Sequence, residues 1–299
     1  MKLGIDSYSY HRYFGECYDG LQQDPGTRMS VEDFLDRAVA LGVQGVSLES
    51  CFLRSDDASI GALRDALDAR RLDRVWAWGH PNGLRSGADA AAAHDCARHL
   101  AIARRVGARV MRICGGGRRT RPATWSEHKR GLVDLLRPLV DQAAEQDVVM
   151  AIENHIDLTA DEMVELVETI GSPWLGVCFD TANNLRMLED PLVVARKLVP
   201  YARATHVKDV TAQKGDPRTF AFWPSVPLGH GLIDVAAILA MLAQSGYDGL
   251  LALEIDYLAP PYVPAGEDAA VAQSIAWLRE KTKAVLARVE TSDHTEPAT

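Results

Sequence analysis

Short apolar stretches that each lead into a segment with helical spacing recur eight times along the chain, and this repetition constrains the fold most. The stretches are continuously apolar, which is typical of parallel strands buried on both faces. Eight strand–helix units in roughly 260 residues match a (β/α)8 barrel, whereas no G-x-G-x-x-G turn supports a doubly wound sheet. The sequence therefore predicts an α/β fold, a single TIM barrel over residues 1–289, with a disordered C-terminal tail over residues 290–299. The predicted strands lie at residues 2–7, 43–49, 74–79, 108–117, 148–153, 175–180, 202–209 and 249–256.

Polar pairs mark where several helices are expected to begin. In each pair a Ser or Thr is followed three residues later by an acidic residue, which is the pattern of a helix N-terminal capping box. The pairs are Ser30 with Asp33, Thr124 with Glu127, and Thr159 with Glu162.

Charge and cysteine content limit the expected partners and compartment. The net charge is −9, from 32 basic and 41 acidic residues, whereas a nucleic-acid-binding protein would be expected to carry a basic face. Five scattered cysteines without a C-x-x-C pair are typical of reduced thiols. The chain begins without a signal-peptide pattern, and no apolar run reaches the roughly 20 residues of a membrane helix. We therefore expect a cytoplasmic protein that acts on a small molecule, not on nucleic acid or a membrane; a homodimer or a homotetramer is compatible with the sequence.

Polar residues end four successive strands of the second half of the predicted barrel. They are Glu153, Asp180, His206 and Glu254. Each has an ordinary explanation when taken alone: a carboxylate can pair with an arginine or a helix N-terminus, and a histidine can be a satisfied core residue. In a barrel, however, the carboxyl ends of all strands meet at one mouth, where enzymes of this fold keep their sites. Carboxylates gathered there would repel one another and raise each other's pKa, so a divalent cation is the simplest explanation of the set.

Three carboxylates and one imidazole are a hard, oxygen-rich ligand set. This set suits Mn²⁺ best, and it also suits Mg²⁺, Co²⁺ or Zn²⁺. The absence of a thiolate argues against a structural zinc site. Two further octahedral positions would remain for adjacent oxygens of a substrate, such as a carbonyl and its neighbouring hydroxyl.

Four segments of the chain resemble the sugar phosphate isomerase/epimerase family of xylose isomerase-like TIM barrels. These are IENH at 152–155, the strand-final Asp180, HVKD at 206–209 and LEID at 253–256. The family includes ketose 3-epimerases, hydroxypyruvate isomerases and inosose dehydratases. The resemblance implies that the four strand-end residues bind a metal, and that Glu153 and Glu254 also act as catalytic acid and base. The implied function is an isomerase or epimerase of a small keto sugar or sugar derivative that works through a metal-stabilised enediolate.

The chain departs from the ketose 3-epimerases at three positions. Asn183, Thr159 and Ala212 stand where those enzymes have histidine, glutamate and arginine. The alternative function is therefore a metal-dependent lyase, a decarboxylase or dehydratase of an oxidised sugar or 3-oxo sugar acid, with the same metal site. A sugar-binding barrel without activity and a nuclease are weaker alternatives, because the metal residues are all present while the extra histidines of a three-zinc nuclease are missing.

Further side chains near the predicted mouth are candidates for substrate contacts. Lys208 lies two residues after His206 and should point the same way, towards a carboxylate or an enolate oxygen, with a bridge to Asp180 or Asp209 as the structural explanation. The substrate-binding candidates are His80, Arg112, His155, Asn183 and Lys208. Three other histidines lie on predicted helices and are expected to face solvent: His94, His99 and His128.

Overall fold

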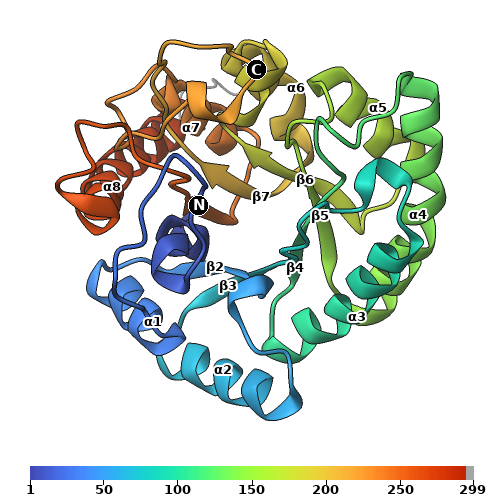
Figure 1. The fold of residues 1–299 in the computed structure, drawn as a ribbon, viewed down its shortest axis with the longest axis horizontal. Coiled ribbons are helices and arrows are strands. Elements are labelled where there is room, and N and C mark those ends of the chain that lie inside the picture. Colours follow the sequence, from blue (N-terminus) through green and yellow to red (C-terminus); the bar gives the residue numbers. More distant parts are fainter. Residues whose placement is uncertain (294–299) are drawn as a thin grey trace.

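A computed structural model of the protein describes residues 1–293, with side chains described for residues 1–288. Its parallel strands form a closed barrel in chain order, from β1 through β8 and back to β1, which confirms the predicted TIM barrel. The helices surround the barrel as an outer ring (Figure 1). The strands are β1 (Lys2–Asp6), β2 (Gly45–Glu49), β3 (Asp73–Ala77), β4 (Val110–Cys114), β5 (Val149–Glu153), β6 (Leu175–Asp180), β7 (Ala202–Val207) and β8 (Leu250–Leu253).

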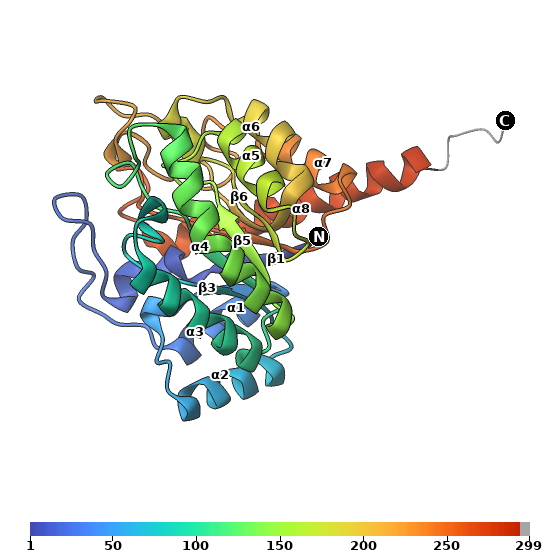
Figure 2. The same ribbon diagram turned by 90° about the vertical axis from the view of Figure 1, so that its right-hand side faces the viewer.

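A helix follows each strand along the chain, as the alternating sequence pattern predicts. The helices are α1 (Val31–Ala40), α2 (Asp57–Ala69), α3 (Ala90–Val106), α4 (Trp125–Gln146), α5 (Ala160–Ile170), α6 (Pro191–Leu198), α7 (Val235–Gln244) and α8 (Gly266–Asp293). Helix α8 continues to Asp293, beyond the predicted boundary at 289, and its end projects from the barrel (Figure 2). The rest of the predicted tail lies outside the described residues. No helix in the described part of the chain is both long and apolar enough to cross a membrane.

The barrel interior below the strand ends is filled by small apolar side chains. Glu153, Asp180 and His206 each lie two positions after a member of this cluster, and residues two apart on a strand face the same way. The apolar cluster therefore forms the floor beneath these polar side chains. Its buried members are Val75, Ala151, Cys178, Ala204 and Leu250.

Helix α5 is the next element after the strand that carries Glu153, and its start is fixed by a complete capping box. The Thr159 side chain accepts a hydrogen bond from Glu162 N (3.3 Å), and Thr159 N donates to Glu162 Oε2 (2.8 Å). The capping box at Ser30 and Asp33 is also complete, while Thr124 caps α4 by accepting from Glu127 N. The predicted helix starts are thus confirmed.

Thr159→Ala should lower the free energy of unfolding by about 1 kcal/mol, because the α5 N-terminus loses its side-chain acceptor. Urea denaturation of the metal-free protein measures this change. Thr159→Ser keeps the hydroxyl and should retain most of the stability. An equal loss in both variants would mean that the methyl group, not the cap, is responsible.

Two of the three helical histidines are not at the surface. His94 is exposed as predicted, but the prediction is wrong for His99 and His128. His99 Nδ1 accepts a hydrogen bond from Trp76 Nε1 at 3.1 Å, on the inner side of α3. His128 is fully buried, with Nε2 3.5 Å from Asp157 Oδ2 in the loop after β5. The prediction used only the location of these histidines on helices, which does not show whether a residue of α3 or α4 faces the barrel or the solvent.

Candidate metal centre

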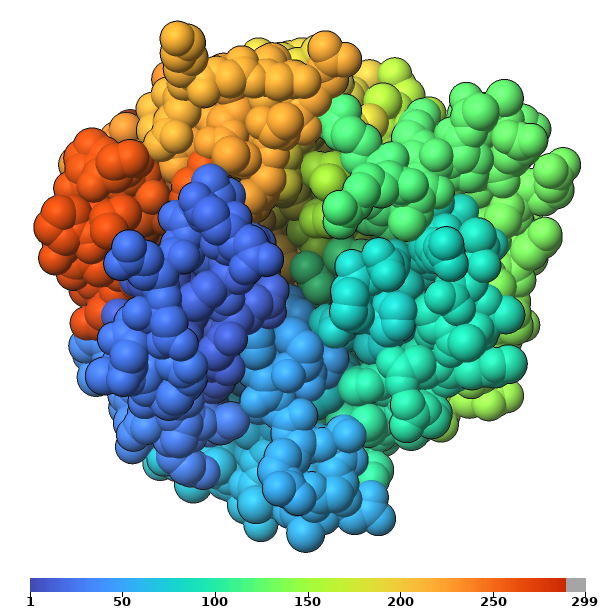
Figure 3. Space-filling view, viewed as in Figure 1, coloured from blue at the N-terminus to red at the C-terminus, as the bar shows by residue number. Residues whose placement is uncertain are grey.

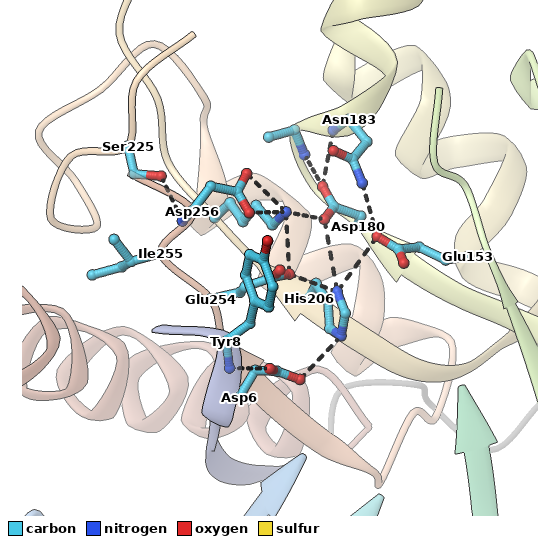
Figure 4. Close-up of polar contacts among 12 residues, drawn as sticks. Asp6, Tyr8, Glu153, Asp180, Asn183, His206, Ser225, Glu254, Ile255 and Asp256 are labelled. Atoms are coloured by element: carbon cyan, nitrogen blue, oxygen red, sulfur yellow. Dashed lines mark hydrogen bonds and ion pairs between the residues drawn. The ribbon is translucent and has the colours of Figure 1, made fainter. Parts of the chain in front are cut away.

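Glu153, Asp180, His206 and Glu254 come together at the carboxyl ends of β5 to β8, as the sequence predicted. One potential ligand atom from each residue lies within 4.8 Å of every other. All four side chains are buried, and they point towards a common centre (Figure 4). His206 Nδ1 is 2.6 Å from Glu254 Oε2, 3.5 Å from Glu153 Oε1 and 3.9 Å from Asp180 Oδ2.

Several polar atoms that face this centre form ion pairs with one another and with Lys208 but no hydrogen bonds within the described part of the chain, and a bound divalent cation would give them direct partners. Asp180 Oδ1 accepts hydrogen bonds from Ala182 N (2.8 Å) and Asn183 N (2.9 Å), which leaves Oδ2 facing the centre. Asp180 Oδ2, His206 Nδ1 and Glu254 Oε2 are buried without a hydrogen-bond partner among the described residues. Buried polar atoms are normally satisfied. Three carboxylates and one imidazole therefore fit a divalent cation at this position.

Asp6, at the end of β1, lies behind the imidazole of His206, on the side away from the other carboxylates. Its Oδ2 lies 3.4 Å from His206 Nε2, while its Oδ1 accepts from Tyr8 N at 2.7 Å. This leaves His206 Nδ1 towards the three carboxylates (Figure 4). A carboxylate behind a metal-binding histidine commonly fixes its tautomer and ring orientation. Asp6 was not predicted, although it too is an acidic residue at a strand end.

Asp6→Asn should weaken Mn²⁺ binding by about 10–100-fold, because the asparagine amide cannot hold His206 in the same tautomer and charge state. Isothermal titration calorimetry of metal-free wild type and variant measures the Kd. Asp73→Asn, at the opposite end of the barrel on β3, is a suitable control and should bind Mn²⁺ normally. An unchanged Kd in Asp6→Asn would show that His206 needs no orienting carboxylate.

Lys208 is a buried cation enclosed by carboxylates, not a free contact for substrate. Its Nζ lies 3.0 Å from Asp180 Oδ2, 3.1 Å from Glu254 Oε2 and 3.1 Å from both oxygens of Asp256. Burial would lower the pKa of Lys208, but these carboxylates hold it well above the ordinary value. Of the two predicted bridges, the one to Asp180 is present. Asp209 instead accepts backbone hydrogen bonds from Gly229, Gly231 and Ile233.

Arg112 likewise pairs with two buried glutamates. Its guanidinium lies 2.6 Å from Glu153 Oε2 and 3.3 Å from Glu49 Oε1. Burial opposes ionisation of Glu153, but Arg112 and His206 hold the pKa of this carboxyl well below its usual range. Burial raises the pKa of Glu49 to about 8, although Arg112 opposes this. The two glutamates on either side of one arginine thus differ in their readiness to ionise.

A cavity of about 630 Å³ opens above the centre, and Figure 3 shows this face of the molecule hollowed near its middle. Four of the five predicted substrate contacts line it: His80, Arg112, His155 and Lys208. Asn183 is not on the wall; it is buried and donates to Glu153 Oε1 at 2.8 Å. The wall also contains residues outside the predicted set of substrate contacts: Tyr8, Glu16, Tyr18, Glu49, Arg118, Arg119, Arg186, Phe220 and Asp256.

Comparison with known proteins gives a matching family model, curated relatives and similar solved structures. A family model described as xylose isomerase-like TIM barrel matches residues 35–281. A 3-oxo-isoapionate decarboxylase of Pectobacterium atrosepticum is 24% identical over 155 residues, which is 52% of this chain and 54% of the relative. An inosose dehydratase of Clostridium tetani is 25% identical over 148 residues, 46% of this chain and 50% of the relative. The chain thus spans about half the length of these curated relatives.

Solved structures share the fold over nearly the whole chain. A xylose isomerase domain protein from Planctomyces limnophilus superposes with a TM-score of 0.74 at 22% identity, covering 95% of this chain and 97% of its own. An L-ribulose 3-epimerase gives 0.73 at 17% identity, covering 99% of each chain. The IOLI protein, whose crystal structure has a bound zinc atom, gives 0.69 at 15% identity, covering 96% of this chain and 99% of its own. These likenesses describe the fold.

Proposed function

Because the chain belongs to the xylose isomerase-like TIM barrel family, we propose that it is a metal-dependent isomerase or epimerase of a small keto sugar or sugar derivative. The reaction would be proton transfer at a carbon beside a carbonyl. One observation carries the proposal: the carboxylate of Glu254 lies both in the metal cluster and on the cavity wall. A proton-accepting group is thereby next to the place where a bound carbonyl compound would meet the cation.

Glu153, Asp180, His206 and Glu254 would hold the cation, and Mn²⁺ suits this donor set best. When bound, a divalent cation there would polarise a substrate carbonyl and offset the charge that develops as a neighbouring C–H loses its proton.

The two glutamates differ in how firmly they are held. Glu153 Oε1 accepts from Asn183, and its Oε2 contacts Arg112 and accepts from Cys114 Sγ at 3.3 Å, so both of its oxygens are occupied. Glu254 makes its contacts with His206 and Lys208 through Oε2 alone. Burial raises the pKa of Glu254, although His206 and Lys208 oppose this. Glu254 is therefore the better proton acceptor, and Glu153 serves chiefly as an ionised ligand.

A lyase is the second candidate, and the departures from the ketose 3-epimerases at Asn183, Thr159 and Ala212 favour it. The names of two relatives, a 3-oxo-isoapionate decarboxylase and an inosose dehydratase, point to the same class. In a decarboxylation, the carbon that loses CO₂ keeps the electron pair of the broken bond and must gain a proton. A protonated Glu254 would supply that proton.

The first test is hydrogen exchange in D₂O with Mn²⁺-loaded protein, followed by NMR on a panel of ketoses, keto sugar acids and oxidised polyols. Deuterium entering at a carbon beside a carbonyl, only when metal is present, would support the isomerase or epimerase, and the labelled carbon separates the two. Release of CO₂, or the appearance of a product that has lost the elements of water, would support the lyase instead. Failure of the protein to bind Mn²⁺ in calorimetry, with no exchange on any compound, would overturn both.

A further inference from the structure

We propose that the substrate carries an anionic group, a carboxylate or a phosphate, and that Arg118, Arg119 and Arg186 bind it on the cavity wall. This inference rests on the proposed function, since it specifies the substrate class of the same site. It assigns this role to cations other than Arg112 and Lys208, the two cationic side chains among the predicted substrate contacts. Five cationic side chains, those of four arginines and Lys208, line the wall. They differ in whether they already contact a carboxylate.

Arg112 and Lys208 are already neutralised. Arg112 contacts two carboxylates and Lys208 contacts three, all of them buried. A ligand anion could reach either cation only in competition with these fixed partners. The two cations are therefore part of the acidic centre, and they add little positive charge to the cavity.

Arg186 has no such partner. It lies in the short 3-10 helix after β6, Asn183–Met187, and is only 7% exposed. Its guanidinium donates to Asn183 Oδ1 and lies 5.1 Å from the ring centre of Phe220. No carboxylate lies within 4 Å of it among the described side chains. Asp256 interacts with Arg186 only at longer range and is itself in contact with Lys208. A buried charge with no carboxylate in contact is costly, and an anionic ligand would offset that cost.

Arg118 and Arg119 extend the same positive surface from the loop after β4. Both are exposed on the cavity wall, and neither has a carboxylate within 4 Å among residues 1–288. Arg118 donates to the backbone oxygen of Arg186, so the two cations are neighbours. Partial burial and the nearby charge of Arg218 lower the pKa of Arg118, Asp216 opposes this at longer range, and Arg186 adds to the lowering. Like charges held this close favour a bound anion.

The loop that presents these arginines is fixed before any ligand arrives. Gly117 N donates to Thr120 Oγ1 (2.9 Å), and the Thr120 and Ser86 hydroxyls lie 2.8 Å apart. A Cβ on Gly116 would come within 2.3 Å of Ser86 Oγ, so the close approach of the two loops requires glycine there. An anion site whose backbone is already positioned loses less entropy on binding, although the arginine side chains still have to be ordered.

The anion would lie close to the metal-binding oxygens of the substrate. A single side-chain amide, that of Asn183, links the Arg186 guanidinium to Glu153: it accepts from Arg186 and donates to the glutamate at 2.8 Å. The cavity therefore has an acidic, cation-binding part beside an arginine-rich part. A small sugar acid or sugar phosphate matches this arrangement, whereas an uncharged sugar leaves the arginines without a counter-ion.

Three polyols that differ at one end test the inference: D-glucitol, D-gluconate and D-glucitol 6-phosphate. Their Kd values would be measured by calorimetry on metal-free and on Mn²⁺-loaded protein at physiological salt. We expect at least one anionic polyol to bind about tenfold or more tightly than D-glucitol, since hydrogen bonds to charged groups are the stronger ones. The better of the two anions identifies carboxylate or phosphate.

The variants separate the arginine site from direct binding of the anion to metal. Arg118→Gln/Arg119→Gln changes only exposed side chains and should remove most of the preference for the anion; Arg186→Gln should do the same if it folds. Arg196→Gln, an exposed residue on α6 outside the cavity, should retain the preference. Equal binding of all three polyols, or a preference that survives in the double variant, would overturn the inference. A separate Mn²⁺ titration shows whether the proposed function fails independently.

Discussion

Glu254→Gln should lower metal-dependent proton exchange by about 10²–10⁴-fold, the usual contribution of a positioned general base. Glutamine has nearly the same shape and keeps a carbonyl oxygen for the cation, but its amide cannot accept the proton from carbon. Of the two glutamates in the metal cluster, only Glu254 also has an oxygen that is not engaged by a described neighbour. NMR exchange in D₂O on the best substrate of the panel gives the rate.

Metal binding and proton transfer have to be distinguished, because Glu254 takes part in both. Asp180→Asn is the matched control: it weakens a metal ligand but leaves the proposed base in place. We expect excess Mn²⁺ to restore much of the exchange rate in Asp180→Asn and little of it in Glu254→Gln. If excess metal restores both variants equally, Glu254 is a ligand only and the base lies elsewhere, with Glu49 on the cavity wall as the next residue to test.

The fold was predictable because its signal is repeated. Strands such as β2, β5 and β6 are buried on both faces, so they appear in the sequence as largely apolar runs, and eight runs of this kind agree with one another. The convergence of Glu153, Asp180, His206 and Glu254 was predictable for the same reason, because the carboxyl ends of parallel strands meet at one mouth. Asp6 shares that position, but its additional role as the N-cap of the following 3-10 helix gives it an ordinary local explanation.

The charge balance of the cavity could not be predicted, because it depends on which side chains approach one another across strands. Lys208 points towards the mouth as its spacing indicated, yet Asp256 and Glu254 from the next strand's end enclose it. Asn183 lies behind Glu153 and not on the wall, because the chain turns into a 3-10 helix directly after β6. Arg118 and Arg119 lie in a loop, where no periodicity shows which way a side chain points.

Lys208→Met should destabilise the metal-free protein by about 3–5 kcal/mol, the usual cost of removing one partner from a buried ion pair. Methionine fills similar space without charge, so Asp180, Glu254 and Asp256 would lose the cation that all three contact. Urea unfolding in the presence of EDTA measures the loss. If the variant is nearly as stable as wild type in EDTA, Lys208 is not the counter-ion on which the acidic centre depends.

The same variant also distinguishes the stabilising effect of Lys208 from that of a bound Mn²⁺. Mn²⁺ binds the native state, so it should stabilise both proteins, and it should restore part of the stability lost in Lys208→Met. The recovery should be incomplete, because the cation would neutralise Asp180 and Glu254 but not Asp256, which is outside the ligand cluster. Lys208→Met/Asp256→Asn removes that remaining charge and should be more stable than the single variant, both with and without metal. If the double variant is no more stable than Lys208→Met, Asp256 does not carry an uncompensated charge. Lys208 would then stabilise the protein through Asp180 and Glu254 alone.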